Sequence, residues 1–427
     1  MPDVLIHPEF NLERSLSAQM LTLLRIVADA AGTRQLPLYL VGGFVRDLML
    51  DIPAADFDLV VEGDAIALAK ALAAEYGGRV TGHVRFGTAQ WFRPDSDGHA
   101  LDFSSTRSEI YKHPGALPTV KPGRLREDLV RRDFTINTLA LRLDGAHWGE
   151  LHDELDGLND LKGGLVRVLH SHSFLDDPTR LFRAVRYEQR YGFRIAPETL
   201  MLIPPARPLV GSLSAERIRH ELDLILDEEK AAAMLKRLAE LDLLQPVHPA
   251  LAWNDQKRKR FINGWRTERN RNIKTVPPFA GRNFLNWHFW LLDLPLNGIE
   301  SLEQRLHFHA KLQGSLLAAS ALFTDLLSLT NIKPSQCVAR LEGLPLSAVY
   351  VVCLSVPDGE ARQNLINYLE TWRHVKPKTN GYHLQKLGLP PGPHYQKVLS
   401  RLRQAWLDGE VGTEGEETKL LEKLMKM

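Results

Sequence analysis

The stretch that most constrains the fold of this chain is LYLVGGFVRDLMLDIPAADFDLVVEG, residues 38–63. An apolar strand runs into Gly42 and Gly43, a helix-like segment follows, and a second strand begins at the carboxylates Asp56 and Asp58. Because side chains alternate along a strand, the two carboxylates are predicted to lie on the same face. Neighbouring carboxylates repel each other, and a divalent cation relieves that repulsion. The stretch therefore predicts a strand that carries a pair of metal-binding carboxylates on one face.

Oxygen ligands of this kind suit Mg²⁺, which substrate phosphates can complete. A pair of such ions would activate an attacking oxygen and stabilise a leaving pyrophosphate. Gly42 and Gly43 would let a triphosphate approach the backbone at the start of the helix, and Arg46 would add a bidentate phosphate contact. The alternative is a solvated pair of aspartates beside an ordinary tight turn. The glycine pattern does not match the G-x-G-x-x-G fingerprint of dinucleotide-binding folds.

The composition excludes several classes of protein. A chain of 427 residues with 44% hydrophobic residues is long enough for about two to four domains. A net charge of +1 gives no global basic field, so any surface for nucleic acid is expected to be local. The two cysteines exclude a disulfide framework and suit a reducing cytoplasm. Neither a signal peptide nor a membrane-spanning run is expected, and nothing in the sequence indicates a protein partner.

The order of strand and helix signals predicts an α+β region followed by an all-α region. Strand-like and helix-like segments mix between Leu36 and about Leu169, with Asp64 as the expected N-cap of one helix, and strand signals nearly vanish beyond Asp176. The segment 107–130, rich in proline and glycine, is expected to be a mobile connection, and the C-terminal residues a mobile tail or a loose helix. The predicted helices span 11–31, 43–50, 64–76, 177–191, 214–226, 230–242, 301–328, 360–373 and 394–407.

Two further stretches gather polar side chains. In RRDFTINTLAL, residues 131–141, an aspartate and an asparagine are suitable acceptors for ribose hydroxyls, although Asp133 could instead cap a helix. In DDPTRLFRAVRYEQRYGFRI, residues 176–195, a helical wheel places one acid and three arginines on one arc and apolar residues on the opposite arc. The alternative for the second stretch is an ordinary surface network of aspartate and arginine.

Taken in this order, the stretches resemble the nucleotidyltransferase superfamily that includes DNA polymerase β. The fuller form, GGxVRD followed by DFD, resembles the class II tRNA nucleotidyltransferases, or CCA-adding enzymes, and the related bacterial poly(A) polymerases. RRDFTIN matches the RRDxTxN element of that family, and DDPTR resembles its EDxxR element with Asp176 in place of the glutamate. The resemblance covers residues 36–230 and, more loosely, the tail element within 376–411.

The resemblance implies a polymerase β-like head domain with a mixed sheet, followed by an all-α neck, body and tail. The implied domains are the head with an N-terminal helix at 1–165, the neck with a base-templating helix at 166–228, the RNA-contacting body at 229–375 and the tRNA-binding tail at 376–427.

The resemblance also implies roles for individual residues. Asp56 and Asp58 would hold the metals, and Asp102 would be the third catalytic carboxylate, unless it is a buried structural aspartate paired with Arg107. The triphosphate would be bound by Gly42, Gly43, Arg46 and Arg132, and also by Arg183 and Arg186. The ribose would be bound by Asp133 and Asn137, and the base by Asp177 and Arg180. Helix capping and a local ion-pair network are expected for Ser214, Glu216 and Arg217.

RNA contacts are expected in the basic stretch 253–274 and at the start of a tail helix. The predicted residues are Lys257, Arg258, Arg260 and Gly392, with a simple solvated face as the alternative for the basic stretch. The implied activity is the metal-dependent addition of CMP, AMP or both to the 3′ end of tRNA from CTP and ATP, in the cytoplasm. Addition of A only or CC only, poly(A) tailing, and a catalytically inactive tRNA-binding protein remain alternatives.

Overall fold

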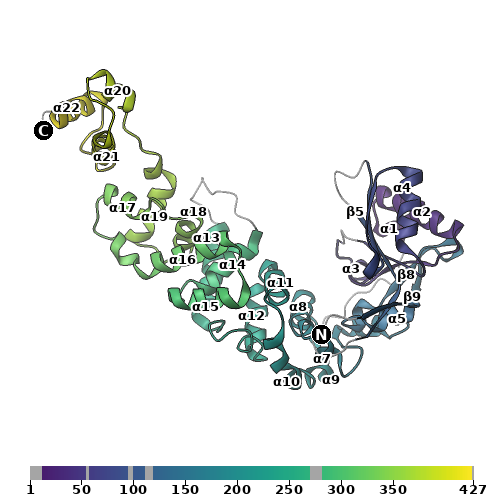
Figure 1. Ribbon diagram of the computed structural model, residues 1–427. Helices are drawn as coiled ribbons and strands as arrows, with labels where there is room; N and C mark the ends of the chain where they lie inside the picture. The colour runs from purple at the N-terminus through teal and green to yellow at the C-terminus, as the bar shows by residue number, and fades with distance from the viewer. Residues whose placement is uncertain (1–11, 54–56, 95–99, 111–118, 270–280, 426–427) are drawn as a thin grey trace. The chain divides into compact units, whose positions relative to one another are not determined.

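The structure is a computed structural model that describes residues 12–53, 57–94, 100–110, 119–269 and 281–425 (Figure 1). The chain separates into two compact units. Unit 1 contains Met1–Arg217 and Glu240–Pro246, and unit 2 contains Ile218–Ala239 and Val247–Met427. The predicted α+β class is confirmed, whereas the division into four domains stays a prediction.

A mixed seven-stranded sheet forms the centre of unit 1, with the strand order β3-β4-β5-β2-β1-β8-β9. Strands β2 and β5 run parallel, and the other neighbouring pairs are antiparallel. The strands are β1 (Leu38–Val41), β2 (Asp58–Val61), β3 (Arg79–His83), β4 (Thr88–Phe92), β5 (Ala100–Ser105), β8 (Ala140–Arg142) and β9 (Glu150–His152). The strand-like stretches LPLYLV, FDLVVEG, GTAQWF and ALDFSST of the sequence correspond to β1, β2, β4 and β5, while β3, β8 and β9 were not predicted.

Helices pack on the sheet because its strands alternate apolar side chains between two faces. Tyr39 and Val41 of β1 lie in one core cluster with Leu125 and Leu129 of α5 (Leu125–Val130). Helix α4 (Ala65–Tyr76) packs against β4, β5 and α2 (Ala18–Thr33). The predicted N-cap of α4 is confirmed, since Asp64 Oδ1 accepts hydrogen bonds from the first turn.

The rest of unit 1 is built from short elements around one longer helix, α8. These are α1 (Leu12–Ser15), α3 (Gly43–Met49), β6 (Arg107–Ile110), β7 (Thr119–Pro122), α6 (Gly157–Gly163), β10 (Leu165–Val166), α7 (Ser173–Asp176), α8 (Thr179–Tyr191), β11 (Arg194–Ile195), α9 (Pro197–Leu200) and α10 (Ile203–Ala206). Helix α11 (Ala215–Asp227) starts in unit 1 and continues in unit 2.

The described part of unit 2 is helical, as the sequence predicts for the C-terminal region. Its helices are α12 (Ala231–Glu240), α13 (Asp255–Arg269), α14 (Gly281–Leu291), α15 (Leu296–Leu306), α16 (Ala310–Thr324), α17 (Pro334–Leu341), α18 (Leu346–Ser355), α19 (Glu360–Glu370), α20 (Gly381–Lys386), α21 (Pro393–Leu407) and α22 (Glu414–Met425).

Three predictions of local structure were wrong. The single helix expected at 301–328 is two helices, because His307 has a φ of 51° and His309 caps α16 through the backbone N–H of Leu312. The expected mobile connection at 107–130 contains the β6–β7 hairpin and α5. The single helix expected at 11–31 is interrupted at residues 16–17, between α1 and α2. Of the two alternatives for the C-terminal residues, a helix is present: α22 packs through Leu421 against Leu384 and Leu402.

Among the described residues, no single helix is long and apolar enough to cross a bilayer. The consecutive helices α17 and α18 reach that length and composition only when they are joined, and they meet at a bend of 118°.

Candidate active site

The turn between β1 and α3 brings Gly42 against the guanidinium group of Arg132. Gly42 has a φ of +74°, and a Cβ atom there would lie 2.5 Å from Arg132 Nη1, so the turn requires glycine. The adjacent Gly43 is the first residue of α3. Arg132 Nη2 also donates to Asp128 Oδ2 at 3.1 Å, and the Asp128 side chain is fully buried. We did not predict Asp128 from the sequence, although it precedes Arg131 and Arg132 at the spacing of helical ion pairs.

Arg46 links α3 to α8 from a buried position. The residue is 3% exposed and donates to Asp47 Oδ1 at 2.9 Å and to Asn137 Oδ1. Its guanidinium carbon lies 4.9 Å from the ring centroid of Tyr187 and 4.7 Å from that of Tyr191. Tyr191 Oη in turn donates to Asp47 Oδ1 at 2.8 Å. Arg46 is thus enclosed by these partners, and its predicted contact with a triphosphate remains a prediction.

Asp133 joins the RRDFTIN stretch to α8. Its Oδ1 accepts from Asn137 Nδ2 at 2.7 Å and from the backbone N–H of Phe134 at 2.9 Å. Its Oδ2 accepts from Nε and Nη2 of Arg183 at 2.8 Å and 2.6 Å. Burial alone would raise the pKa of the Asp133 carboxyl, but the charge of Arg183 and the hydrogen bond from Asn137 hold that pKa below its usual range. A carboxylate has about four acceptor positions, so a ribose hydroxyl would have to displace one of these donors.

Asp177 is fixed through one of its two oxygens. Asp177 Oδ1 accepts from Arg217 Nη2 at 2.6 Å and from the backbone N–H and hydroxyl of Thr179 at 3.0 Å and 2.7 Å. No described residue donates a hydrogen bond to Asp177 Oδ2. The predicted cap at Ser214 is present, but sequence reasoning missed the bond from Arg217 to Asp177. No spacing rule connects residues 40 positions apart.

The arginines of α8 are more buried than the helical wheel predicts. Arg180 is 6% exposed and donates from Nη1 to Ser173 Oγ at 2.6 Å and from Nη2 to the Arg131 carbonyl at 2.6 Å. Arg186 is also buried, with its guanidinium carbon 5.4 Å from the ring centroid of Tyr187. The predicted contacts of Arg180 with a base and of Arg183 and Arg186 with a triphosphate remain predictions. The apolar arc behind them is buried as expected, at Leu181, Phe182 and Val185.

Asp58 and Asp102 lie side by side on the sheet. Asp58 begins β2 and pairs in register with Asp102 of the parallel strand β5, so their side chains point to the same face. Both residues are exposed, and Gln90 Nε2 donates to Asp102 Oδ1 at 2.9 Å. The alternative of a buried structural Asp102 is therefore wrong. Asp56 lies outside the described residues.

The donor chemistry of this central part of the sheet fits Mg²⁺, because two exposed carboxylates face one way from the adjacent strands β2 and β5. The described residues alone contain no group of three or more His, Cys, Asp or Glu side chains that could hold a metal ion. A complete ligand set beside Asp58 and Asp102 would therefore need further oxygens, which Asp56 and the substrate phosphates are predicted to supply.

The residues predicted to contact RNA differ in their exposure. Lys257 and Arg260 are 4% and 6% exposed, and both face Asp293, with Arg260 Nη1 donating to Asp293 Oδ1 at 3.2 Å. Burial lowers the pKa of the Lys257 ammonium, although the charge of Asp293 opposes that shift. Both side chains are buried within unit 2, and their predicted phosphate contacts remain predictions. Arg258 is exposed, and Gly392 is partly exposed directly before α21.

Two family models match the chain. The model described as "Poly A polymerase head domain" matches residues 38–167, which include the glycine turn, the sheet carboxylates and the RRDFTIN stretch. The model described as "Probable RNA and SrmB- binding site of polymerase A" matches residues 192–254.

Similar proteins carry the names of tRNA-processing enzymes. The chain is 34% identical to an A-adding tRNA nucleotidyltransferase of Geobacter sulfurreducens over 97% of its own length and 48% of that relative. It is 32% identical to an A-adding tRNA nucleotidyltransferase of Halalkalibacterium halodurans over 91% of its own length and 88% of that relative. The chain thus spans about half of the first relative and most of the second.

Solved structures agree in fold. A complex of the Thermotoga maritima CCA-adding enzyme with tRNA has a TM-score of 0.77 at 28% identity, covering 97% of both chains. Structures of a CCA-adding enzyme with ATP and with CTP have TM-scores of 0.78 at 26% and 27% identity. The ATP complex is matched over 100% of this chain and 99% of that one, and the CTP complex over 97% and 98%. Together with the glycine turn, the paired sheet carboxylates and the RRDFTIN network, these similarities show that the chain belongs to the tRNA nucleotidyltransferase family.

Proposed function

We propose that this chain adds AMP, CMP or both from ATP and CTP to the 3′ end of tRNA, without a nucleic-acid template. The observation that carries the proposal is the hydrogen-bonded chain Arg46–Asn137–Asp133–Arg183, which joins three motifs that lie far apart in the sequence. The names of the relatives, and the tRNA, ATP and CTP in the similar structures, support the same activity.

Selection of the base is assigned to Asp177 and Arg180. Arg217 and Thr179 hold Asp177 Oδ1, so Oδ2 can accept the exocyclic amino group of cytosine or adenine. An arginine N–H beside it can donate to a ring nitrogen. Guanine and uracil lack this combination of donor and acceptor, so the pair would select against them.

Binding of the triphosphate is assigned to Arg132 beside Gly42. The Arg132 guanidinium lies against the glycine backbone, and its bond to the buried Asp128 fixes its direction. An arginine held in this way binds a phosphate with little loss of side-chain entropy. Asp133 and Asn137 border the same network and are proposed to contact the ribose after one of the donors to Asp133 is displaced.

Mg²⁺ is the proposed cofactor, held by Asp56 and Asp58, with Asp102 as the third catalytic carboxylate beside Asp58. When bound, it favours deprotonation of the 3′-hydroxyl of tRNA and offsets the charge on departing pyrophosphate. The 3′-oxygen attacks the α-phosphorus, the bond between the α-phosphorus and its bridging oxygen breaks, and pyrophosphate leaves with the electron pair. No nucleophilic side chain is required, because the substrate hydroxyl is the nucleophile.

Addition of A alone is a second candidate. Both relatives described above are named A-adding enzymes, and the chain covers 88% of one of them. The solved structures described above are named CCA-adding enzymes, so full CCA synthesis remains the competing form. Because tRNA is the proposed substrate, we propose that the protein acts in the cytoplasm. We also propose that Arg258 and Gly392 contact the RNA.

The test is an incubation of the purified chain with Mg²⁺ and each labelled nucleoside triphosphate. Three tRNA substrates are compared, ending at the discriminator base, in C, and in CC. Addition of C, C and A to the first supports CCA synthesis, and a single A on the last alone supports A addition. Long A tails would identify a poly(A) polymerase, and extension that stops at CC a CC-adding enzyme.

Absence of any extension, with tRNA still bound, would favour the inactive binding protein and contradict the proposal. Calorimetric titration with ATP and CTP in Mg²⁺ then distinguishes an inactive tRNA-binding protein from a nucleotidyltransferase, since the inactive protein is expected to bind neither nucleotide.

A further inference from the structure

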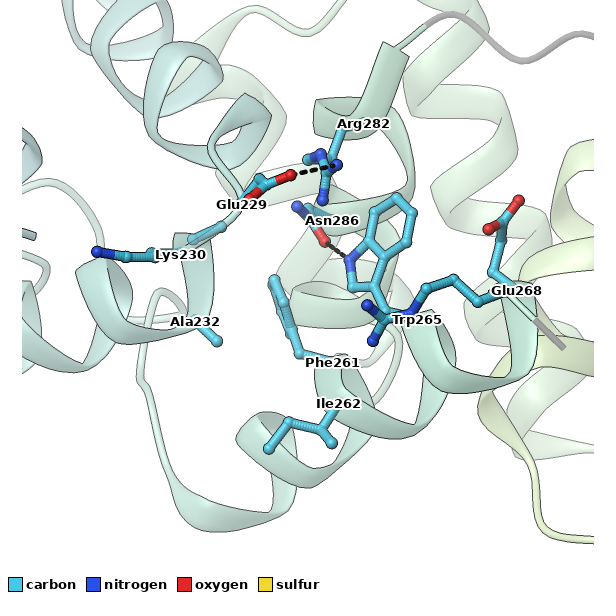
Figure 2. A pocket seen from close by; sticks show the side chains of 11 residues that line it. Glu229, Lys230, Ala232, Phe261, Ile262, Trp265, Glu268, Arg282 and Asn286 are labelled. Atoms are coloured by element: carbon cyan, nitrogen blue, oxygen red, sulfur yellow. Dashed lines mark hydrogen bonds and ion pairs between the residues drawn. The ribbon is translucent and has the colours of Figure 1, made fainter. Parts of the chain in front are cut away.

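A pocket of about 560 Å³ lies in unit 2, and none of the residues that line it is assigned to nucleotide transfer (Figure 2). Figure 2 shows Phe261, Ile262 and Trp265 of α13 on one side of the pocket, and Lys230 and Ala232 at the start of α12 on the other. We call this cavity the Trp265 pocket. Its walls combine an aromatic and aliphatic surface with charged groups at the rim, which suits a ligand that is itself both flat and charged.

The indole of Trp265 is held rigidly. Its Nε1 donates to Asn286 Oδ1 at 2.7 Å, and Asn286 Nδ2 donates to the Leu226 carbonyl at 2.7 Å. The guanidinium carbon of Arg282 lies 4.7 Å from the indole centroid, and Arg282 Nη2 lies 3.9 Å from Glu229 Oε1. A ring fixed in this way loses little freedom on binding, so contact with a ligand is favoured.

The charge on α13 continues the pattern outside the pocket. Arg258, Ile262, Trp265 and Arg269 recur at i, i+4, i+7 and i+11, so they share one face of the helix over about 16 Å. Arginines thus flank an aliphatic and an aromatic residue, and Ile262 is 50% exposed although it is apolar. On the adjacent row, Lys259 and Arg266 are exposed as well.

The acids near this face do not neutralise it. Asp255 pairs with Arg258 at 3.3 Å, but both side chains are largely exposed, and such pairs contribute little. Helix α13 carries Asp255 and Glu268 as its acids, against the four exposed cations Arg258, Lys259, Arg266 and Arg269. The face therefore complements a polyanion better than it complements a neutral or acidic protein surface.

We propose that the Trp265 pocket receives one unpaired nucleotide of the bound RNA. The base would lie against Trp265 and Ile262, and the flanking phosphates beside Arg269 and Arg258. A paired base cannot enter, because it is stacked within its duplex, whereas unpaired loop bases can be splayed out onto aromatic and guanidinium groups. The inference rests on the proposed function only for the identity of the RNA, namely tRNA.

Two surface variants test the two halves of the pocket without cutting into the core. Ile262→Ser removes the apolar contact and leaves the charge unchanged, and Leu327→Ser at a residue 83% exposed is its matched control. Arg269→Gln removes one exposed cation, and Lys311→Gln on α16 is its matched control. The affinity for tRNA is measured at several salt concentrations with the full chain, together with the affinity for ATP.

We expect both pocket variants to raise the Kd for tRNA at least about fivefold, as for loss of a stacked or charged contact to a nucleotide. Arg269→Gln should also reduce the slope of log K against log salt concentration by about the amount that one phosphate contact contributes, whereas Ile262→Ser should leave this slope unchanged. Dimethyl sulfate probing should show one unpaired base that the wild type protects and Ile262→Ser does not. The affinity for ATP and the rate at saturating tRNA should not change.

The inference would be overturned if the pocket variants bound tRNA with Kd values like those of the two controls, or if the protected base stayed protected in Ile262→Ser. Extension of tRNA by the wild type would in that case leave the proposed function standing. If the wild type binds tRNA without extending it and the pocket variants bind tRNA more weakly, the inference stands and the proposed function is overturned.

Discussion

Replacing Gly42 with alanine should damage the site far more than the same change at the neighbouring Gly43. At Gly42 the φ of +74° is a conformation that costs a non-glycine residue about 1–3 kcal/mol, and the new Cβ would lie 2.5 Å from Arg132 Nη1. At Gly43 the Cβ would lie 3.3 Å from Arg46 Nη2, and the φ is not in the left-handed region. The two variants therefore add the same methyl group one residue apart with different consequences.

We expect Gly42→Ala to lower the free energy of unfolding by about 2 kcal/mol, and Gly43→Ala to change it by less than about 1 kcal/mol. Because the methyl group pushes the Arg132 guanidinium aside, the Kd for ATP should rise about tenfold or more in Gly42→Ala, the usual cost of losing a hydrogen bond to a charged group. Urea denaturation without nucleotide and calorimetric ATP titration provide the two values. Equal losses of unfolding free energy in the two variants would refute the strain assigned to Gly42, and unchanged ATP binding in Gly42→Ala would refute the assignment of Arg132 to the triphosphate.

Three further results are expected. Alanine at Asp58 should abolish nucleotide incorporation and alanine at Asp102 should slow it at least about a hundredfold, with tRNA binding retained in a gel-shift assay; normal turnover in both variants would contradict the metal assignment. Arg217→Ala should release Asp177 and increase misincorporation of UTP and GTP relative to ATP and CTP, measured as ratios of kcat/KM, whereas a merely structural role would lower the kcat/KM values of all four nucleotides together. Burial lowers the pKa of His288 to about 4, so the unfolded chain binds the proton more strongly than the folded chain. The free energy of unfolding should therefore fall by about 2–3 kcal/mol between about pH 6.5 and pH 4.5. Urea titrations at the two pH values should show this loss in the wild type and not in His288→Gln.

Local pattern was sufficient for much of the first unit. The strand signals around Leu38–Val41 and Asp58–Val61 and the cap at Asp64 follow from alternation and capping chemistry, which act over a few residues. The same rules failed at 301–328, because the helix break at His307 depends on one backbone conformation that the helical spacing of apolar residues does not reveal. They also missed the β6–β7 hairpin, whose strands are short and largely polar.

The residues of the candidate site also fall into those that short sequence motifs reveal and those that depend on contacts between distant positions. The residue types and their order identified the glycine turn, the carboxylates and the α8 arginines, since their chemistry is carried by short motifs. Which oxygen of Asp177 is occupied, and by Arg217, depends on a contact across 40 positions.

Burial was decided only by the tertiary structure. Arg46, Lys257 and Arg260 look like surface cations in the sequence, yet each is almost completely buried beside a carboxylate. A charge is tolerated inside a protein only when the fold brings it a partner, and such partners come from distant parts of the chain. The sequence by itself determined which chemical groups this protein carries and in which local elements. Only the tertiary structure decided which of them remain available to a substrate.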